Sequence, residues 1–195
     1  MKLLVSLFLT FSTGLLMGQI DNEHLKVGAS APRIIAKDQH GELIDSQEIL
    51  KEHQLLLIFY RGNWCPHCQK HLNALQSHLQ ELKSKGVFVV VVSPESEART
   101  KETSEMISSD FAIVHDKGNV IMNDYKVAFE VNKETVPTYY EKMNDLLATY
   151  NVDNSNVLPV PATYLISKAG KISYVHYDPD YKNRSDLAEV LEMVE

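Results

Sequence analysis

Two apolar runs with a helical pattern between them dominate the middle of the chain. Residues 54–60 and 87–92 are almost entirely apolar, and unbroken runs of this length are typical of strands buried on both faces of a sheet. Between them, leucines recur every three or four positions, which predicts an amphipathic helix that ends at Gly86: Leu72, Leu75, Leu79 and Leu82. A strand, a helix and a strand in this order predict a right-handed unit with two parallel strands.

Shorter elements flank this unit. Before it, the pattern predicts a strand at 33–37, a turn at 38–41, a return segment at 42–44 and a short helix that Ser46 caps and that reaches Lys51. After it, the pattern predicts a helix within 93–109, beginning after Pro94, and a strand at 111–115.

In the last third of the chain, the pattern predicts a helical insertion over the sheet and then a hairpin. Residues 120–156 contain a helical stretch at 133–149, which begins or bends near Pro137 because proline lacks the N–H of a helix interior. Residues 162–166 and 171–177 form an antiparallel pair, and Ser185 caps a final helix. The whole pattern predicts one α/β domain with a central mixed sheet flanked by helices.

The first residues differ from the rest. Residues 3–16 are apolar, apart from Ser, Thr and Gly, and follow Lys2; the run is shorter than the roughly 20 residues of a membrane-spanning helix. Gly18 offers a cleavage point before a polar stretch. We expect a signal peptide at 1–18 and an exported domain at 19–195, periplasmic or secreted, without stable membrane insertion after cleavage. A retained N-terminal anchor is the alternative.

Composition excludes one class of partner. The chain has 195 residues and a formal net charge of -7, and its lysines and arginines form no basic run. Because binding to nucleic acid depends on clustered positive charge, no nucleic-acid partner is expected. No cofactor is expected either.

Cysteine is used sparingly and in one place. The two cysteines, Cys65 and Cys68, enclose Pro66 and His67 where a buried strand meets a helix. A thiolate at Cys65 is stabilised there by the helix N-terminus, so Cys65 is the predicted nucleophile, and Cys68 resolves the mixed disulfide. We expect His67 to favour the thiolate and to make the couple more oxidising. Trp64 offers a flat surface beside the site.

Two other interpretations of the cysteine pair stay open. A stabilising disulfide is one, although so short a loop constrains the unfolded chain little. A zinc or copper site is the other, since His71 and His78 follow the pair. Both histidines lie on the helix that carries the leucine stripe, and we expect them to be solvated surface residues. Seven tyrosines are interpreted as core or cover of the sheet: Tyr139, Tyr140, Tyr150, Tyr164, Tyr174, Tyr177 and Tyr181.

The segment around the cysteines resembles a known motif. Residues 59–68, Phe-Tyr-Arg-Gly-Asn-Trp-Cys-Pro-His-Cys, are similar to that of the peroxiredoxin-like branch of the alkyl hydroperoxide reductase/thiol-specific antioxidant family, and further matches lie at 27–32, 158–166, 168–172 and 178–181. The resemblance covers about residues 25–195 and implies a thioredoxin fold. It also implies that Pro161 follows a cis peptide bond, faces the cysteines and holds the backbone of Val160 open for an extended substrate. An ordinary strand-entry proline is the alternative.

The resemblance breaks at the residues of peroxide cleavage. True peroxiredoxins resemble one another in a Pro-x-x-x-Thr-x-x-Cys pattern. In that alignment Arg61 stands in place of the proline and Cys65 in place of the threonine, while Cys68 falls on the peroxidatic cysteine. Arg61 is either a helper of the thiolate or of an oxyanion, or an exposed loop residue. Cys65 leads in the thioredoxin alignment and is favoured here as the more exposed and more acidic thiol.

These features lead to three hypotheses. The first is an exported thiol-disulfide oxidoreductase that exchanges with protein thiols and disulfides or with a thioredoxin-like electron donor. The second is a thiol-dependent peroxidase acting on peroxides. The third is a metal-binding protein or metallochaperone.

Overall fold

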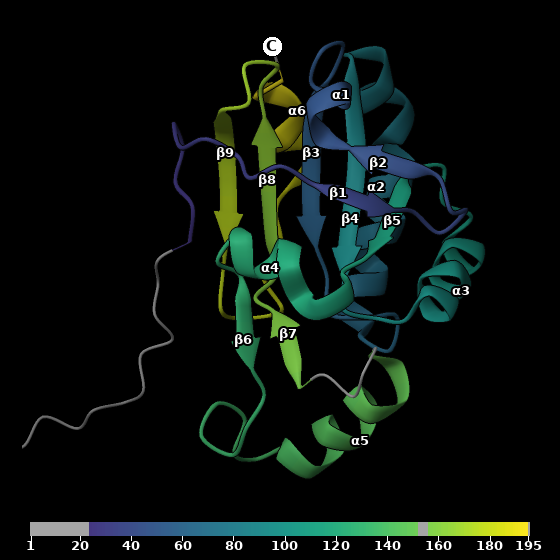
Figure 1. The fold of residues 1–195 in the computed structure, drawn as a ribbon, viewed down its shortest axis with the longest axis vertical. Helices are drawn as coiled ribbons and strands as arrows, with labels where there is room; N and C mark the ends of the chain where they lie inside the picture. Colours follow the sequence, from purple (N-terminus) through teal and green to yellow (C-terminus); the bar gives the residue numbers. More distant parts are fainter. Residues whose placement is uncertain (1–23, 152–155, 195) are drawn as a thin grey trace, which may run out of the picture.

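A five-stranded mixed sheet runs through the computed structural model, which describes residues 24–151 and 156–194 (Figure 1). Its strands, in spatial order, are β5 (Ala112–His115), β4 (Val87–Ser93), β3 (Gln54–Phe59), β8 (Ala162–Ile166) and β9 (Ile172–Tyr177). β3, β4 and β5 are parallel, whereas β8 is antiparallel to both β3 and β9. The predicted parallel pair and the predicted final hairpin are both confirmed.

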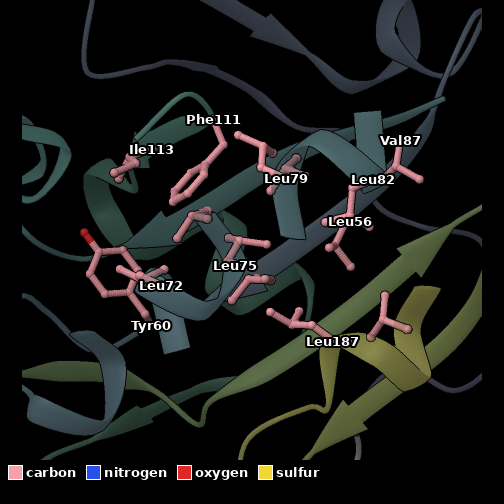
Figure 2. Close-up of a cluster of buried hydrophobic side chains, with 14 of the residues drawn as sticks. Leu56, Tyr60, Leu72, Leu75, Leu79, Leu82, Val87, Phe111, Ile113 and Leu187 are labelled. Carbon is pink, nitrogen blue, oxygen red and sulfur yellow. The ribbon is translucent and has the colours of Figure 1, made fainter. Parts of the chain in front are cut away.

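One face of the sheet is covered by helices. Leu56 and Ile58 of β3 pack there against α2 (Pro66–Ser84) and α6 (Leu187–Glu192), and Ile107 from α3 (Glu97–Ile107) completes the cluster. Figure 2 shows the leucines of α2 gathered in one cluster with Leu56 of the sheet and Leu187 of α6. All four leucines are at most 1% exposed, as the three- and four-residue spacing predicts.

The other face of the sheet is covered by smaller elements. Leu55, Leu57 and Phe59 alternate with the first set along β3 and point to this side. The cover consists of α4 (Val120–Asp124), which follows η1 (Lys117–Asn119), together with α1 (Ser46–Ile49) and an antiparallel hairpin of β1 (Ile35–Lys37) and β2 (Leu43–Asp45). Because both faces are covered, β3 is buried at all six positions.

The insertion stands at one end of the sheet. It consists of the antiparallel pair β6 (Ala128–Glu130) and β7 (Val157–Pro159) together with α5 (Tyr140–Tyr150), beyond the ends at which β3 and β4 finish (Figure 1). Val131, Leu147 and Leu158 form a small core of their own, against which Trp64 packs. The predicted helix therefore exists but begins only after Pro137, at Tyr140.

Two predicted helix caps are displaced by one residue. Asp45, not Ser46, caps α1 by accepting from Gln47 N–H, because the Ser46 hydroxyl instead accepts from Ile34 N–H. α1 ends at Ile49, short of the predicted Lys51. Asp186, not Ser185, caps α6, because Ser185 is turned into the interior, as described below.

The predicted signal peptide at 1–18 lies outside the described residues. Among the residues that are described, no helix combines the length and apolarity needed to span a membrane.

Leu75 tests the packing of α2 on the sheet. It is fully buried, so Leu75→Ala is expected to lower the free energy of unfolding by about 2–5 kcal/mol through lost burial and a residual cavity. Gln80→Ala, on the exposed side of the same helix, should change it by less than about 0.5 kcal/mol. Urea unfolding of the reduced protein measures both, and equal effects would contradict the assigned face.

Candidate active site

The cysteines lie where β3 gives way to α2. Cys65 is the N-cap residue, with an extended backbone (φ −95°, ψ 111°), and Pro66 occupies the first turn, where no N–H is required. Cys68 follows one turn later, on the face that carries the leucines. Cys65 thus adjoins the free N–H groups and the positive end of the helix dipole, as the sequence predicts. Both cysteines are free thiols.

Each sulfur has its own arginine. Arg61 donates through Nη2 to Cys65 Sγ at 3.4 Å, and Arg184 donates through Nη2 to Cys68 Sγ at 3.5 Å. Arg61 belongs to the loop before the motif, whereas Arg184 comes from the segment between β9 and α6. The first contact places Arg61 on Cys65 rather than in solvent.

The two thiols differ in acidity. A hydrogen bond from the Cys68 thiol is the main reason that the pKa of Cys65 lies below its ordinary value, and Arg61 lowers it further against the opposing effect of burial. The same hydrogen bond, together with burial and the adjacent charge of Cys65, raises the pKa of Cys68, while Arg184 opposes the rise. Cys65 is therefore the more acidic thiol, as predicted.

The prediction that Cys65 is the more exposed thiol is wrong. Both cysteines are 1% exposed. Aromatic side chains pack nearby: the Arg61 guanidinium lies 4.1 Å from the ring centroid of Tyr181 and 5.2 Å from that of Trp64. His67 meets Tyr181 edge-on, with 5.6 Å between the ring centroids. Tyr181 therefore packs on Arg61 and His67 beside the cysteines rather than on the sheet, where it was expected.

Gly62 allows the loop to close. Its φ is +153°, and a Cβ there would lie 2.7 Å from Trp64 Cδ1, closer still to Trp64 Nε1, and 3.0 Å from Glu95 Oε1. Any other residue would push Trp64 out of place. The close approach keeps Trp64 between the cysteine loop and the small core of the insertion.

Pro161 differs from what the resemblance implies. The described residues contain no cis peptide bond, so the Val160–Pro161 bond is trans and the implied cis bond is wrong. A trans bond is the intrinsic preference of X–Pro, and the backbone on either side is held extended: Val160 N–H donates to Val127 O at 2.8 Å, and Ala162 pairs with Phe59. Pro161 is a buried strand-entry residue at the end of the sheet from which the cysteine loop leaves.

A buried polar cluster was missed from the sequence. His71 is 8% exposed, not solvated as expected, and its Nε2 lies 3.2 Å from Ser185 Oγ, which lies 2.9 Å from Thr163 Oγ1. Burial, aided by the charge of Arg184, lowers the pKa of His71 to about 4. Helical spacing gave a signal for this placement, because His71 falls three positions after Cys68 and four before Leu75.

Metal binding finds no support in the described residues. His78 is half-buried, and its Nδ1 lies 2.9 Å from Ala74 O, within the same helix. Within 24–151 and 156–194 no three or more histidine, cysteine, aspartate or glutamate side chains are grouped so that they could hold a metal ion.

Comparison with known proteins agrees with this architecture. The model of the AhpC/TSA family matches residues 27–175, most of the described chain. The chain belongs to the AhpC/TSA family. Family members carry out thiol redox chemistry, and the chain is accordingly an oxidoreductase with a thioredoxin fold.

Individual relatives fall into two groups. The chain is 23% identical to a chloroplastic peroxiredoxin Q from Triticum aestivum over 184 residues, which covers 94% of this chain and 71% of that protein. It is 24% identical over 174 residues to the thiol-disulfide oxidoreductase ResA of Bacillus thuringiensis (strain Al Hakam), covering 88% and 83%.

The same division appears among solved structures. The peroxidoxin BcpB of Mycobacterium tuberculosis matches with a TM-score of 0.68 at 15% identity, over 88% of this chain and 97% of that one. The thioredoxin domain of a thiol-disulfide oxidoreductase from Bacteroides vulgatus matches with a TM-score of 0.60 at 20% identity, over 88% and 99%. At these identities the likeness shows the fold alone.

Arg61 provides a test of the thiolate environment. In a Cys68→Ser background, which keeps a hydroxyl donor and leaves one thiol, Arg61→Met is expected to raise the pKa of Cys65 by about 1–3 units, since a neighbouring positive charge favours the thiolate. Ultraviolet absorbance of the thiolate against pH measures the change. Arg33→Met, which removes an arginine paired with Asp45 on the β1–β2 hairpin, is the control and should leave this pKa unchanged. A Cys65 pKa that is the same with and without Arg61 would show that the 3.4 Å contact has no electrostatic role.

Proposed function

We propose that this AhpC/TSA-family chain is an exported thiol-disulfide oxidoreductase that works through Cys65 and Cys68. The observation that carries the proposal is the unequal pair: an acidic thiol at a helix N-terminus, beside Arg61, with a second thiol one turn away. This arrangement is what a nucleophile and a resolving group require. The likeness to ResA proteins over most of the chain supports it.

The proposed reaction is a pair of exchanges. The Cys65 thiolate attacks one sulfur of a substrate disulfide, forms a mixed disulfide and expels the other substrate sulfur as a thiolate. Cys68 then loses its proton and attacks the sulfur of Cys65, which forms the Cys65–Cys68 disulfide and releases the second substrate thiolate. Two electrons pass from the dithiol to the substrate, and the reverse sequence oxidises a substrate dithiol.

We propose a separate task for each arginine in this scheme. Arg61 favours the Cys65 thiolate that begins the reaction. Once Cys65 is in the mixed disulfide, its charge no longer raises the pKa of Cys68, and Arg184 then favours the Cys68 thiolate that completes the reaction.

Export is proposed from the sequence. The apolar stretch at 3–16 and the small residue at Gly18 support removal of a signal peptide, and disulfide exchange is needed in compartments outside the cytoplasm. Protein thiols and disulfides, or a thioredoxin-like donor, are the partners we propose. A mature N-terminus near residue 19, found by mass spectrometry of the native protein, checks the export; an intact N-terminus would contradict it.

Insulin reduction by dithiothreitol tests the exchange chemistry. The intact protein is expected to accelerate the reaction, Cys65→Ser to abolish the acceleration, and Cys68→Ser to accumulate a mixed disulfide at Cys65, because the resolving attack is lost. The reduction potential of the couple, expected between about −270 and −120 mV, fixes the favoured direction. If neither cysteine variant differs from the intact protein, the proposal fails.

One contact favours a second candidate, thiol-dependent peroxide reduction. Cys68 occupies the peroxidatic position of the peroxiredoxin alignment, and Arg184 stands 3.5 Å from its sulfur. In that reaction the Cys68 thiolate attacks a peroxide oxygen and becomes a sulfenic acid as water or an alcohol leaves; the Cys65 thiol then attacks the sulfenic sulfur, which forms the disulfide and releases one water. A thiol donor restores the dithiol.

Arg184 separates the two candidates. A peroxidase that uses Cys68 is expected to lose at least about tenfold of its rate in Arg184→Met, since a charge-assisted contact to the reacting sulfur disappears. The first attack of Cys65 on insulin should be retained in the same variant. Peroxide consumption in the presence of dithiothreitol measures the first rate, and absence of consumption by the intact protein would eliminate the peroxidase.

A further inference from the structure

Glu95 places a carboxyl group inside the protein, next to the cysteine loop. It lies two residues after β4 and is 0% exposed. Its Oε2 accepts from the Tyr60 hydroxyl at 2.9 Å, and its Oε1 accepts from Asn63 N–H at 2.8 Å. A buried carboxyl costs folding free energy unless it is hydrogen-bonded, and both partners of Glu95 belong to the segment that leads from β3 to Cys65.

We infer that Glu95 is a positioning residue for the thiol chemistry: its carboxylate holds the loop of residues 61–64 in the conformation that sets Arg61 against Cys65. The consequence for catalysis rests on the proposed function. The restraint of the loop by Glu95, called the hold below, does not rest on the proposed function, because it consists of contacts within the protein itself.

Besides the bond from Cys65 N–H to Gly62 O at 3.1 Å, two hydrogen bonds fix the middle of the loop. Asn63 N–H is bound by Glu95, and the Asn63 carbonyl accepts from the side chain of Gln69 on α2. A Cβ on the flanking Gly62 would lie within 3.0 Å of both Trp64 and Glu95 Oε1, so the Gly62–Asn63 peptide is packed against both side chains and its movement would move Trp64. Arg61 packs on Trp64 and precedes Gly62, and its 3.4 Å contact with Cys65 depends on the same peptide.

Glu95 itself stands on a fixed base. Its N–H donates to Ser93 Oγ at 3.2 Å, its carbonyl lies 2.5 Å from His115 Nδ1, and its backbone bridges to Asn151 at the end of α5. Ser96 N–H donates to Tyr150 O at 2.9 Å. The sheet and the insertion thus hold Glu95 from two sides, and the carboxyl passes this restraint to the loop.

The hold is sensitive to protonation. Burial raises the pKa of Glu95 to about 7, against the lowering effect of Asn63 N–H, Tyr60 and Arg99; Glu102 raises it. The other titratable group against Glu95 is His115, at its carbonyl. An ionised carboxylate accepts hydrogen bonds about twice as strongly as a neutral group, so the loop is held more firmly above neutral pH than below it.

The linked stability has a definite sign. A carboxyl whose folded pKa is raised binds its proton more tightly in the folded state, so its contribution is complete below the ordinary value of 4.5 and is lost as the pH rises through about 7. The ionised form of Glu95 therefore lowers the stability of the fold while its hydrogen bonds order the loop. A local cost in stability of this kind is expected for a residue retained for positioning.

Trp64 makes the hold observable, because it is the single tryptophan of the chain. In Cys65→Ser/Cys68→Ser protein, which has no thiol to titrate, we expect Trp64 emission to change with a midpoint near pH 7. Glu95→Gln, which keeps an acceptor but cannot ionise, should abolish the transition. Tyr60→Phe should move the midpoint to higher pH, since the Tyr60 hydroxyl lowers the pKa of Glu95.

Two histidine variants near the site serve as controls. His67→Gln and His115→Gln should each keep the transition. A transition that survives in Glu95→Gln, or disappears in either histidine variant, overturns the assignment to Glu95.

A second measurement connects the hold to Cys65. In Cys68→Ser protein, Glu95→Ala is expected to raise the pKa of Cys65 by about one unit, a tenfold loss of thiolate below that pKa, and Glu95→Gln is expected to restore most of it. A purely electrostatic Glu95 would give the opposite sign, because removal of a negative charge lowers a thiol pKa. Downward shifts of the Cys65 pKa of equal size in both variants would therefore contradict positioning. If the Cys65 pKa shifts as expected but the intact protein does not accelerate insulin reduction, only the proposed function is contradicted.

Discussion

A negative charge on Cys65 has almost no contact with water, because the sulfur is buried together with that of Cys68. Burial alone would keep the thiol protonated, so the protein must supply the stabilisation that water does not. It does so from three directions: the N-terminus of α2, the Cys68 thiol and the Arg61 guanidinium. The rest of the site can be understood as the means of keeping these three groups in place.

Arg61 shows how far this requirement extends. A guanidinium beside a buried sulfur has to be held on its other faces, and the rings of Trp64 and Tyr181 do this through cation–π contacts. Trp64 depends in turn on the small core of the insertion and on the missing side chain of Gly62. Tyr181 and Arg184 both belong to the segment between β9 and α6. Elements far apart in sequence, including the insertion and the C-terminal segment, therefore converge on one pair of sulfurs.

Patterns of local spacing predicted the fold well. The parallel pair, the buried stripe of α2 and the final hairpin follow from alternation and helical periodicity, which depend on neighbours in sequence. The place of Cys65 at a helix N-terminus followed from the same pattern. The caps at Ser46 and Ser185 were misplaced by one residue because each hydroxyl finds a tertiary partner, Ile34 N–H and Thr163 with His71, and such partners leave no local mark.

Contacts between residues far apart in the chain were the main features that the sequence pattern could not predict. Arg184 lies 116 positions from Cys68 in the chain, and Glu95 lies 32 from Asn63; in the sequence each is an ordinary charged residue near the end of a predicted element. The cis bond at Pro161 was carried over from a resemblance and had no support in the residues themselves. The burial of Cys65 likewise depends on tertiary packing, because both cysteines belong to the core formed by α2, the sheet and α6.

The burial of Cys65 has a kinetic consequence. A disulfide held in another folded protein cannot reach a cysteine that is 1% exposed, so under the proposed function the packing around Cys65 must open before exchange with such a partner begins. The rate with a bulky disulfide would then level off at high partner concentration, at the frequency with which this packing opens. The same packing that makes Cys65 acidic would thereby limit its rate of reaction. A small reagent and a large one would then give different maximal rates for the same thiol.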